Sequence, residues 1–217
     1  MREIIDIYDD NMNRIGSKDR DEAHRDGDWH KSFHCWIVYR DNKGLDWIVV
    51  QKRGSGKALF PDYLDVTAAG HYIAGETPQD GPREIREELG IHAKFQDLVP
   101  LGVKHEVAKV GNIVNREFVD VFLLVCDSSL SRYPFNPEEV KGLALFRIDD
   151  GLDMCAGNKS RIDAQFVTIH HLQMKDEIVQ KSSTVGLSDF IPRSDAYLYK
   201  ILVLAKRFLN GEAHLVI

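Results

Sequence analysis

The chain has 217 residues, of which 43% are hydrophobic and 29% are charged, and its formal net charge is −6. This length fits one domain with extensions better than two full domains, and the composition is that of an ordinary globular protein. The sequence contains no basic run, which argues against duplex nucleic acid as a partner, so an anionic substrate would need a metal ion or a few placed cations.

The cysteines and the apolar segments indicate the compartment. Cys35, Cys126 and Cys155 are odd in number and widely spaced, which argues against a disulfide framework and favours a reducing compartment. The longest apolar runs, such as VFLLVC, have the length of a strand and are too short to span a membrane. The amino terminus, MREIIDIYDD, has no apolar signal core. We therefore expect a cytoplasmic protein that contacts neither membranes nor nucleic acid.

Strands are predicted for most of the first third of the chain. A short strand at 3–8 and a turn come first, and they are followed by a short polar helix with Ser17 as its N-cap. Two strands at 32–40 and 45–53 flank the turn DNKG, which is typical of a hairpin. A third strand is expected at 63–70.

The second half begins with strands and then becomes helical in pattern. Strands are predicted at 94–107, 115–126 and 142–148, and the pattern after about residue 150 is mostly helical. Ser194 would cap a final apolar helix, which we expect to pack on the sheet or on a second subunit in a homodimer. Strands, one central acidic helix and a closing helix predict an α/β fold with a mixed sheet and helices on both faces.

The central helix carries an unusual acidic face. Glu84, Glu87 and Glu88 lie at positions i, i+3 and i+4, which share one side of a helix. Arg83 and Glu87 form the i, i+4 pair expected of a solvated face, but Glu84 and Glu88 are like charges at the same spacing and repel each other. Three carboxylates on one face fit a hard cation such as Mg²⁺, which prefers oxygen ligands.

A proline stands directly before this acidic face. Thr77 and Pro78 would start a helix well, but Pro82 would then fall near its fifth position, where the missing N–H breaks a hydrogen bond to residue i−4. Gly81 tolerates the geometry that proline imposes on the residue before it. We therefore expect residues 77–80 to form a turn and the regular helix to begin near Gly81 and Pro82.

The segment around this helix resembles the signature of the Nudix hydrolases. That signature reads Gly, five residues, Glu, seven residues, then Arg-Glu-U-x-Glu-Glu-x-Gly-U, where U is apolar. The matching residues here are Gly70, Glu76, Arg83, Glu84, Ile85, Glu87, Glu88, Gly90 and Ile91, with six residues and not seven between Glu76 and Arg83. The resemblance implies an α/β/α sandwich and Mg²⁺- or Mn²⁺-dependent cleavage of a diphosphate linked to another group.

Other segments are similar to the subgroup related to type 1 isopentenyl-diphosphate isomerase. These are AHRDGDWHKSFHCWIVY, VVQKRGSGKALFPDYLDVTAAGH and PEEVKGLALF. In that isomerase a catalytic cysteine stands at the position of Ala69, and two acidic positions correspond to Asn115 and Glu117. Alanine has no thiol to move a proton, whereas the acidic helix is kept, and this exchange favours hydrolysis over isomerisation.

The resemblance also implies roles for single residues. Glu84 and Glu88 are the expected metal ligands, Glu87 is a third ligand or a base that orients water, and the Gly70 carbonyl would complete the shell. Glu117 is a candidate extra ligand or base, although an exposed strand acid is an equally good interpretation.

Four residues are candidates for binding the substrate, namely Lys52, Arg53, Lys57 and His71. Lys and Arg side chains are more often simply solvated at the surface, and this is the alternative interpretation for the three cations. In the isomerase, histidines matching His24, His30 and His71 bind a metal. Because the cysteine is missing here, we expect structural or substrate-contact roles for these three and for His34, and not a second metal site.

The leading hypothesis is a divalent-metal-dependent hydrolase that cleaves the diphosphate linkage of a nucleoside diphosphate derivative or a similar small diphosphate. An isomerase of the isopentenyl-diphosphate type and a non-catalytic diphosphate-binding module remain alternatives. We expect a core domain over 31–150, with an amino-terminal extension over 1–30 packed on it and a mostly helical extension over 151–217.

Overall fold

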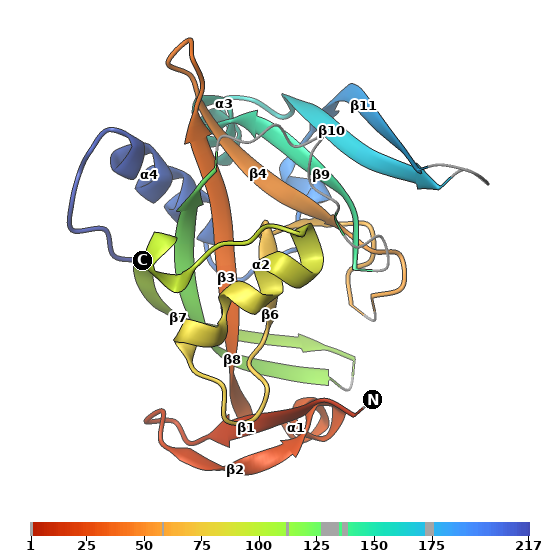
Figure 1. Ribbon diagram of the computed structural model, residues 1–217, viewed down its shortest axis with the longest axis vertical. Helices are drawn as coiled ribbons and strands as arrows, with labels where there is room; N and C mark the ends of the chain where they lie inside the picture. Colours follow the sequence, from red (N-terminus) through yellow and green to blue (C-terminus); the bar gives the residue numbers. More distant parts are fainter. Residues whose placement is uncertain (1, 58, 112, 127–134, 136–138, 172–175) are drawn as a thin grey trace.

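The computed structural model describes residues 2–57, 59–111, 113–126, 135, 139–171 and 176–217. The strands of the described residues join in one sheet, with β3 running through its centre (Figure 1). They are β1 (Ile4–Tyr8), β2 (Arg14–Asp19), β3 (Trp29–Arg40), β4 (Asp46–Arg53), β5 (Leu64–Asp65), β6 (Ala68–His71), β7 (Leu98–Val110), β8 (Ile113–Val125), β9 (Val140–Arg147), β10 (Ile162–His171) and β11 (Asp176–Val185). The helices are α1 (Arg20–Asp26), α2 (Pro82–Leu89), α3 (Ile148–Cys155) and α4 (Tyr197–Leu209), with short 3-10 turns η1 (Pro78–Asp80), η2 (Phe95–Asp97) and η4 (Leu187–Asp189).

The pairing of β3 makes the sheet mixed. β3 runs parallel to β8 over ten residue pairs and antiparallel to β4, β6 and β1. β4 pairs with β3 only over 37–40 of β3, and β6 takes that edge of β3 over 32–35. β6 therefore enters the middle of the sheet, and it brings the end of the strand before α2 into the core.

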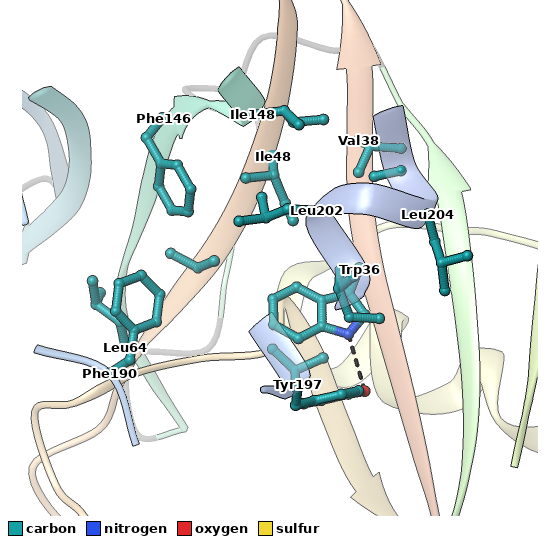
Figure 2. Packing of buried hydrophobic residues seen from close by; sticks show 14 of the residues in the cluster. Trp36, Val38, Ile48, Leu64, Phe146, Ile148, Phe190, Tyr197, Leu202 and Leu204 are labelled. Atoms are coloured by element: carbon teal, nitrogen blue, oxygen red, sulfur yellow. Dashed lines mark hydrogen bonds between the residues drawn. The ribbon is translucent and has the colours of Figure 1, made fainter. Parts of the chain in front are cut away.

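Alternate side chains of β3 serve two separate cores, as the period of two in a strand requires. Trp36 and Val38 pack with α3 and α4 on one face (Figure 2), which we call the α4 face. Phe33 and Ile37 pack with α2 on the other face. The mixed sheet with helices on both faces is thus confirmed.

The predicted strands of the first 150 residues are confirmed, with two local corrections. The prediction of Ser17 as a helix cap is wrong, because β2 continues to Asp19 and the Asp19 carboxylate accepts a hydrogen bond from the Asp21 N–H at 3.0 Å. The single strand predicted at 63–70 is divided into β5 and β6.

The prediction that residues 151–217 are mostly helical is wrong. β10 and β11 form an antiparallel hairpin, and β10 pairs with β9, so the hairpin extends the sheet at the edge opposite β1 and β2 (Figure 1). Along β10, Ile162, Ala164 and Val167 are buried between exposed neighbours, a spacing close to that of a half-buried strand and not that of a helix.

The final helix packs on the sheet of its own chain. Ile201, Leu202 and Ala205 are fully buried against the α4 face, and α4 begins at Tyr197 and not directly after Ser194. The apolar stripe that suggested a second subunit is therefore used within the chain, and the homodimer stays a prediction. None of the helices that the structure describes has the length and apolar character needed to cross a membrane.

Candidate active site

The loop before α2, which is one residue shorter than in the Nudix signature, forms a turn, as expected from Pro82. Pro78–Asp80 forms η1, and the Asp80 carboxylate accepts hydrogen bonds from the Thr77 N–H at 2.9 Å and the Thr77 hydroxyl at 2.8 Å. α2 then begins at Pro82, where a proline needs no N–H partner. Gly81, between the turn and the helix, is in the right-handed helical region with φ of −51° and ψ of −34°, so η1 leads directly into α2 and the expected non-helical geometry before Pro82 is wrong.

Both ends of α2 are set by glycines. An added Cβ on Gly81 would lie 2.3 Å from Cδ2 of the buried Phe33 ring, so only glycine lets the helix start this close to the sheet. Gly90 ends the helix in the left-handed conformation, with φ of 66°. Ile85 and Leu89 anchor the inner side of α2 in the core, and this packing determines where its three glutamates point.

Glu84 packs directly against the glycine at the end of β6. An added Cβ on Gly70 would lie only 2.2 Å from the carboxyl carbon of Glu84. The Arg83 guanidinium lies 2.8 Å from the same carboxylate. The structure therefore brings together the two residues predicted to form one side of a metal site.

Glu88 is a buried carboxylate that no cationic side chain of the described residues pairs with. It is 4% exposed, and it accepts hydrogen bonds from the Ala69 N–H at 3.1 Å and the Gln51 side-chain amide at 3.3 Å. Burial raises the pKa of Glu88 to about 8 and that of Glu84 to about 7. A divalent cation held between these two acids would offset the free-energy cost of keeping their carboxylates charged. The donor set therefore fits Mg²⁺ or Mn²⁺.

Glu87 and Glu76 lie on either side of Arg83. Arg83 donates two hydrogen bonds to Glu76, both at 2.9 Å, and one to Glu87 at 2.9 Å. Glu76 thus orients the arginine, as its place in the signature suggests. The Glu87 side chain is half exposed, so of the three acids on α2 it is the one most open to water.

A second cluster of ligating side chains lies at the end of β3. The ligand atoms of His24, His30 and His71 all lie within 4.8 Å of one another. The Nε2 atoms of His30 and His71 are 3.7 Å and 3.2 Å from one oxygen of Glu117, and both nitrogens are buried without a hydrogen-bond partner. Glu117 is buried and not an exposed strand acid.

Burial also favours the neutral form of two of these histidines, which is the form that can bind a cation. It lowers the pKa of His24 to about 4 and lowers that of His71, so these two rings are neutral near pH 7. Neutral imidazoles and a carboxylate that converge on one point are a donor set typical of Zn²⁺ or Mn²⁺. His34 is not part of this cluster, because its Nδ1 lies 3.0 Å from the hydroxyl of Tyr197 in the core.

Comparison with known proteins decides the family. The model of the NUDIX domain matches residues 28–166, well over half of the chain. The chain belongs to the Nudix family. An uncharacterized Nudix hydrolase of Clostridium acetobutylicum is 36% identical over 203 residues, covering 94% of this chain and 96% of that protein.

Two further relatives agree with this assignment. Isopentenyl-diphosphate Delta-isomerase 1 of Photorhabdus laumondii is 29% identical over 154 residues, which are 68% of this chain and 81% of that protein. The crystal structure of DR0079 from Deinococcus radiodurans matches with a TM-score of 0.53 and 24% identity, over 72% of this chain and 91% of that chain, and this likeness concerns the fold alone. As a Nudix hydrolase the protein is an enzyme of the pyrophosphohydrolase class.

The three cationic side chains predicted to bind substrate interact with different acidic residues. Lys57 lies near enough to Glu88 to lower the pKa of that acid in part, and it pairs with Glu139. Arg53 donates to Asp65 at 3.0 Å, whereas the charge of Lys52 acts on the exposed Asp62. The roles of all three in substrate binding stay predictions.

Several contacts of the folded chain were not found from the sequence. Gln51 reaches Glu88 from β4, and Ala69 contributes its backbone N–H. The sequence signal for Gln51 is a polar residue that ends the apolar run WIVV. No motif indicates Asp65, Arg193 or Glu106, which meet only in the folded chain.

The raised pKa of Glu88 predicts how the stability of the metal-free protein changes with pH. The folded-state pKa of about 8 exceeds the ordinary value of 4.5, so the folded state binds the extra proton between these pH values. This contribution to the free energy of unfolding is therefore lost as pH rises through that window. Thermal melting in the presence of a chelator should show Glu88→Gln gaining stability relative to the natural chain between pH 6 and about 8.

The matched control for this effect is Glu22→Gln, at an exposed position on α1. It should melt in parallel with the natural chain between pH 6 and about 8, because the substitution changes an exposed side chain and leaves the buried Glu88 in place. A stability difference between Glu88→Gln and the natural chain that does not change with pH would contradict the prediction.

Proposed function

We propose that the protein is a divalent-metal-dependent hydrolase that cleaves the diphosphate linkage of a nucleoside diphosphate derivative or a similar small diphosphate. The observation that carries this proposal is the pair Glu84 and Glu88, one helical turn apart, with Glu84 against Gly70 and Glu88 buried without a cationic partner among the described residues. A carboxylate is costly to bury unless a cation offsets its charge.

Each residue of the Nudix helix has a distinct task in this proposal. Glu84 and Glu88 hold Mg²⁺ or Mn²⁺, with the Gly70 carbonyl completing the donor set. When bound, the cation neutralises charge on the diphosphate oxygens and makes a water ligand more acidic. Glu87, open to solvent on the same face, accepts the proton of the attacking water, and Glu117 is the second candidate for this role. Arg83 forms ion pairs with both Glu84 and Glu87 and so orients their carboxylates.

A panel of nucleotides and diphosphates, assayed with Mg²⁺ and with Mn²⁺, tests the proposal. Metal-dependent cleavage of members of the panel into two phosphate-bearing products, such as two phosphomonoesters, supports it. Interconversion of the two five-carbon diphosphates without release of phosphate would support the isomerase alternative, which Ala69 opposes. Binding of diphosphates without turnover would support a non-catalytic module.

We further propose that His24, His30, His71 and Glu117 bind a second divalent cation. The sequence favoured structural or substrate-contact roles, but the geometry favours a metal, because two buried Nε2 atoms converge on one oxygen of Glu117 and the ligand atoms of all three histidines lie within 4.8 Å of one another.

The His24→Asn variant should lose about one equivalent of Zn²⁺ or Mn²⁺, measured by elemental analysis after gel filtration, because one of three nitrogen ligands is removed. The absorption spectrum of the Co²⁺-loaded protein should change with it. His105→Asn is the control, since His105 is exposed. Equal metal content in the natural chain, His24→Asn and His105→Asn would contradict the second site.

A further inference from the structure

Arg193 is a partly buried arginine that the Nudix signature does not include. It lies in the segment between η4 and α4, and its Nη2 donates to Asp65 at 2.9 Å. Its Nε lies 3.4 Å from Glu106 on β7. The Arg193 side chain is 14% exposed, so the segment before α4 delivers a positive charge into the interior.

The two acids that bind Arg193 lie on strands next to elements of the two candidate metal centres. Asp65 ends β5, three residues before β6, whose Ala69 N–H binds Glu88. Glu106 lies directly opposite Glu117 in the ladder of β7 and β8, and Glu117 contacts the histidine cluster. Arg193 therefore links β5 to β7, and each of these strands neighbours an element of one candidate centre.

Tyr197, the first residue of α4, holds this segment in place. The Trp36 indole N–H donates to the Tyr197 hydroxyl at 3.1 Å (Figure 2), and the same hydroxyl lies 3.0 Å from Nδ1 of His34. The carbon of the Arg193 guanidinium lies 5.1 Å from the centre of the Tyr197 ring. Such a stacked guanidinium keeps a fixed plane, which is what recognition of a planar pair of oxygens requires.

Unused hydrogen-bonding groups lie around the same acids. Nη1 of Arg193 makes no hydrogen bond to the described residues. Nε of Arg53, which shares Asp65 with Arg193, is buried without a hydrogen-bond partner, as is the hydroxyl of Ser32, opposite His71 in the ladder of β3 and β6. Buried polar atoms normally have partners, so these two donors are available to the oxygens of a polar ligand.

We propose that Arg193 is a substrate-binding residue that, together with Arg53 on the other oxygen of Asp65, grips the diphosphate of the substrate. The inference rests on the proposed hydrolase function and adds to it the residue that the carboxy-terminal segment contributes. Asp65 positions both guanidiniums, with Arg53 at 3.0 Å and Arg193 at 2.9 Å. The free N–H groups of Arg193 suit phosphate oxygens, which arginine binds in pairs.

The test measures both catalysis and direct binding. In Arg193→Lys and Arg193→Ala, KM should rise about 10-fold or more while kcat falls less than about threefold, because a charge-assisted contact to the ground state is lost. Affinity for inorganic pyrophosphate with saturating Mg²⁺, measured by calorimetry, should fall by the same factor. Low millimolar guanidinium should partly restore the affinity of Arg193→Ala and have no effect on Arg193→Lys.

Arg161→Ala is the matched control, because Arg161 also lies in the carboxy-terminal segment and pairs with an aspartate, Asp189, but is exposed. It should leave KM and pyrophosphate affinity unchanged. If Arg193→Ala does not fold, the test uses Arg193→Lys, because lysine keeps a positive charge beside Asp65 and so preserves the fold.

Two outcomes separate this inference from the proposed function. A natural chain that hydrolyses no member of the panel, yet binds Mg²⁺-pyrophosphate about 10-fold more tightly than Arg193→Lys, would refute the hydrolase and uphold the role of Arg193 in binding. Pyrophosphate affinity equal within twofold in the natural chain and folded Arg193 variants would overturn the inference, whatever the activity of the natural chain.

Discussion

Replacing Glu88 with glutamine is expected to lower the turnover number at least about 100-fold with the fold intact, because a charged ligand for the divalent cation is lost. Glutamine keeps the size of the side chain and one carbonyl oxygen for the Ala69 N–H and the Gln51 amide. It also removes a buried carboxylate whose pKa is raised to about 8, so the metal-free variant should be no less stable than the natural chain.

Steady-state kinetics with a hydrolysed member of the panel would measure this loss, and circular dichroism and thermal melting would check the fold. Glu22→Gln serves again as the control, because it removes one carboxylate from an exposed helix position. Near-normal turnover in Glu88→Gln would end the assignment of the metal site to the α2 acids.

Replacing Gly70 with alanine should lower activity about 100-fold with little loss of stability, because a displacement of about 1 Å at a catalytic group has this effect on rate. The new methyl group would stand 2.2 Å from the carboxyl carbon of Glu84. That carboxylate is the far end of a flexible side chain, so it can move aside, but it then leaves the position proposed for metal binding.

A second glycine provides the contrast. In Gly81→Ala the methyl group would meet the Phe33 ring at 2.3 Å, and a buried ring cannot move as an exposed side chain does. Overpacking of this kind costs roughly 1–3 kcal/mol, so Gly81→Ala should lower the melting temperature. Gly56→Ala, with no atom within 4 Å of the added Cβ, should change neither property. Equal activity of Gly70→Ala and Gly56→Ala would contradict the position assigned to Glu84.

The proline shows what local sequence can predict. Pro82 lacks an N–H, and from this fact the turn at η1 and the start of α2 follow without tertiary information. The need for glycine at Gly81 comes instead from the Phe33 ring, a tertiary contact. Local reasoning also failed after residue 150. There β10 pairs with β9, a strand outside the local sequence window, and β11 pairs with β10.

The convergence of the three histidines could not be predicted from local sequence patterns. His24 comes from α1, His30 from β3 and His71 from β6, so their convergence depends on the antiparallel pairing of β6 with β3. The sequence suggested a second metal site only through family resemblance, and the missing cysteine argued against it. The loss of a thiol at Ala69 says nothing about the geometry of nitrogen ligands that other elements contribute.

The sequence by itself determined the acidic face of α2, its glycine boundaries, most strands of the first 150 residues and the Nudix family. These features are local, because helix periodicity, capping and backbone freedom act over a few residues. Only the tertiary structure decided that Glu88 is buried without a cationic partner among the described residues, that three histidines meet and two of them contact Glu117, and that Arg193 reaches Asp65 across 128 positions of the chain. Burial and charge pairing depend on which distant segments the sheet brings together, and no local pattern records them.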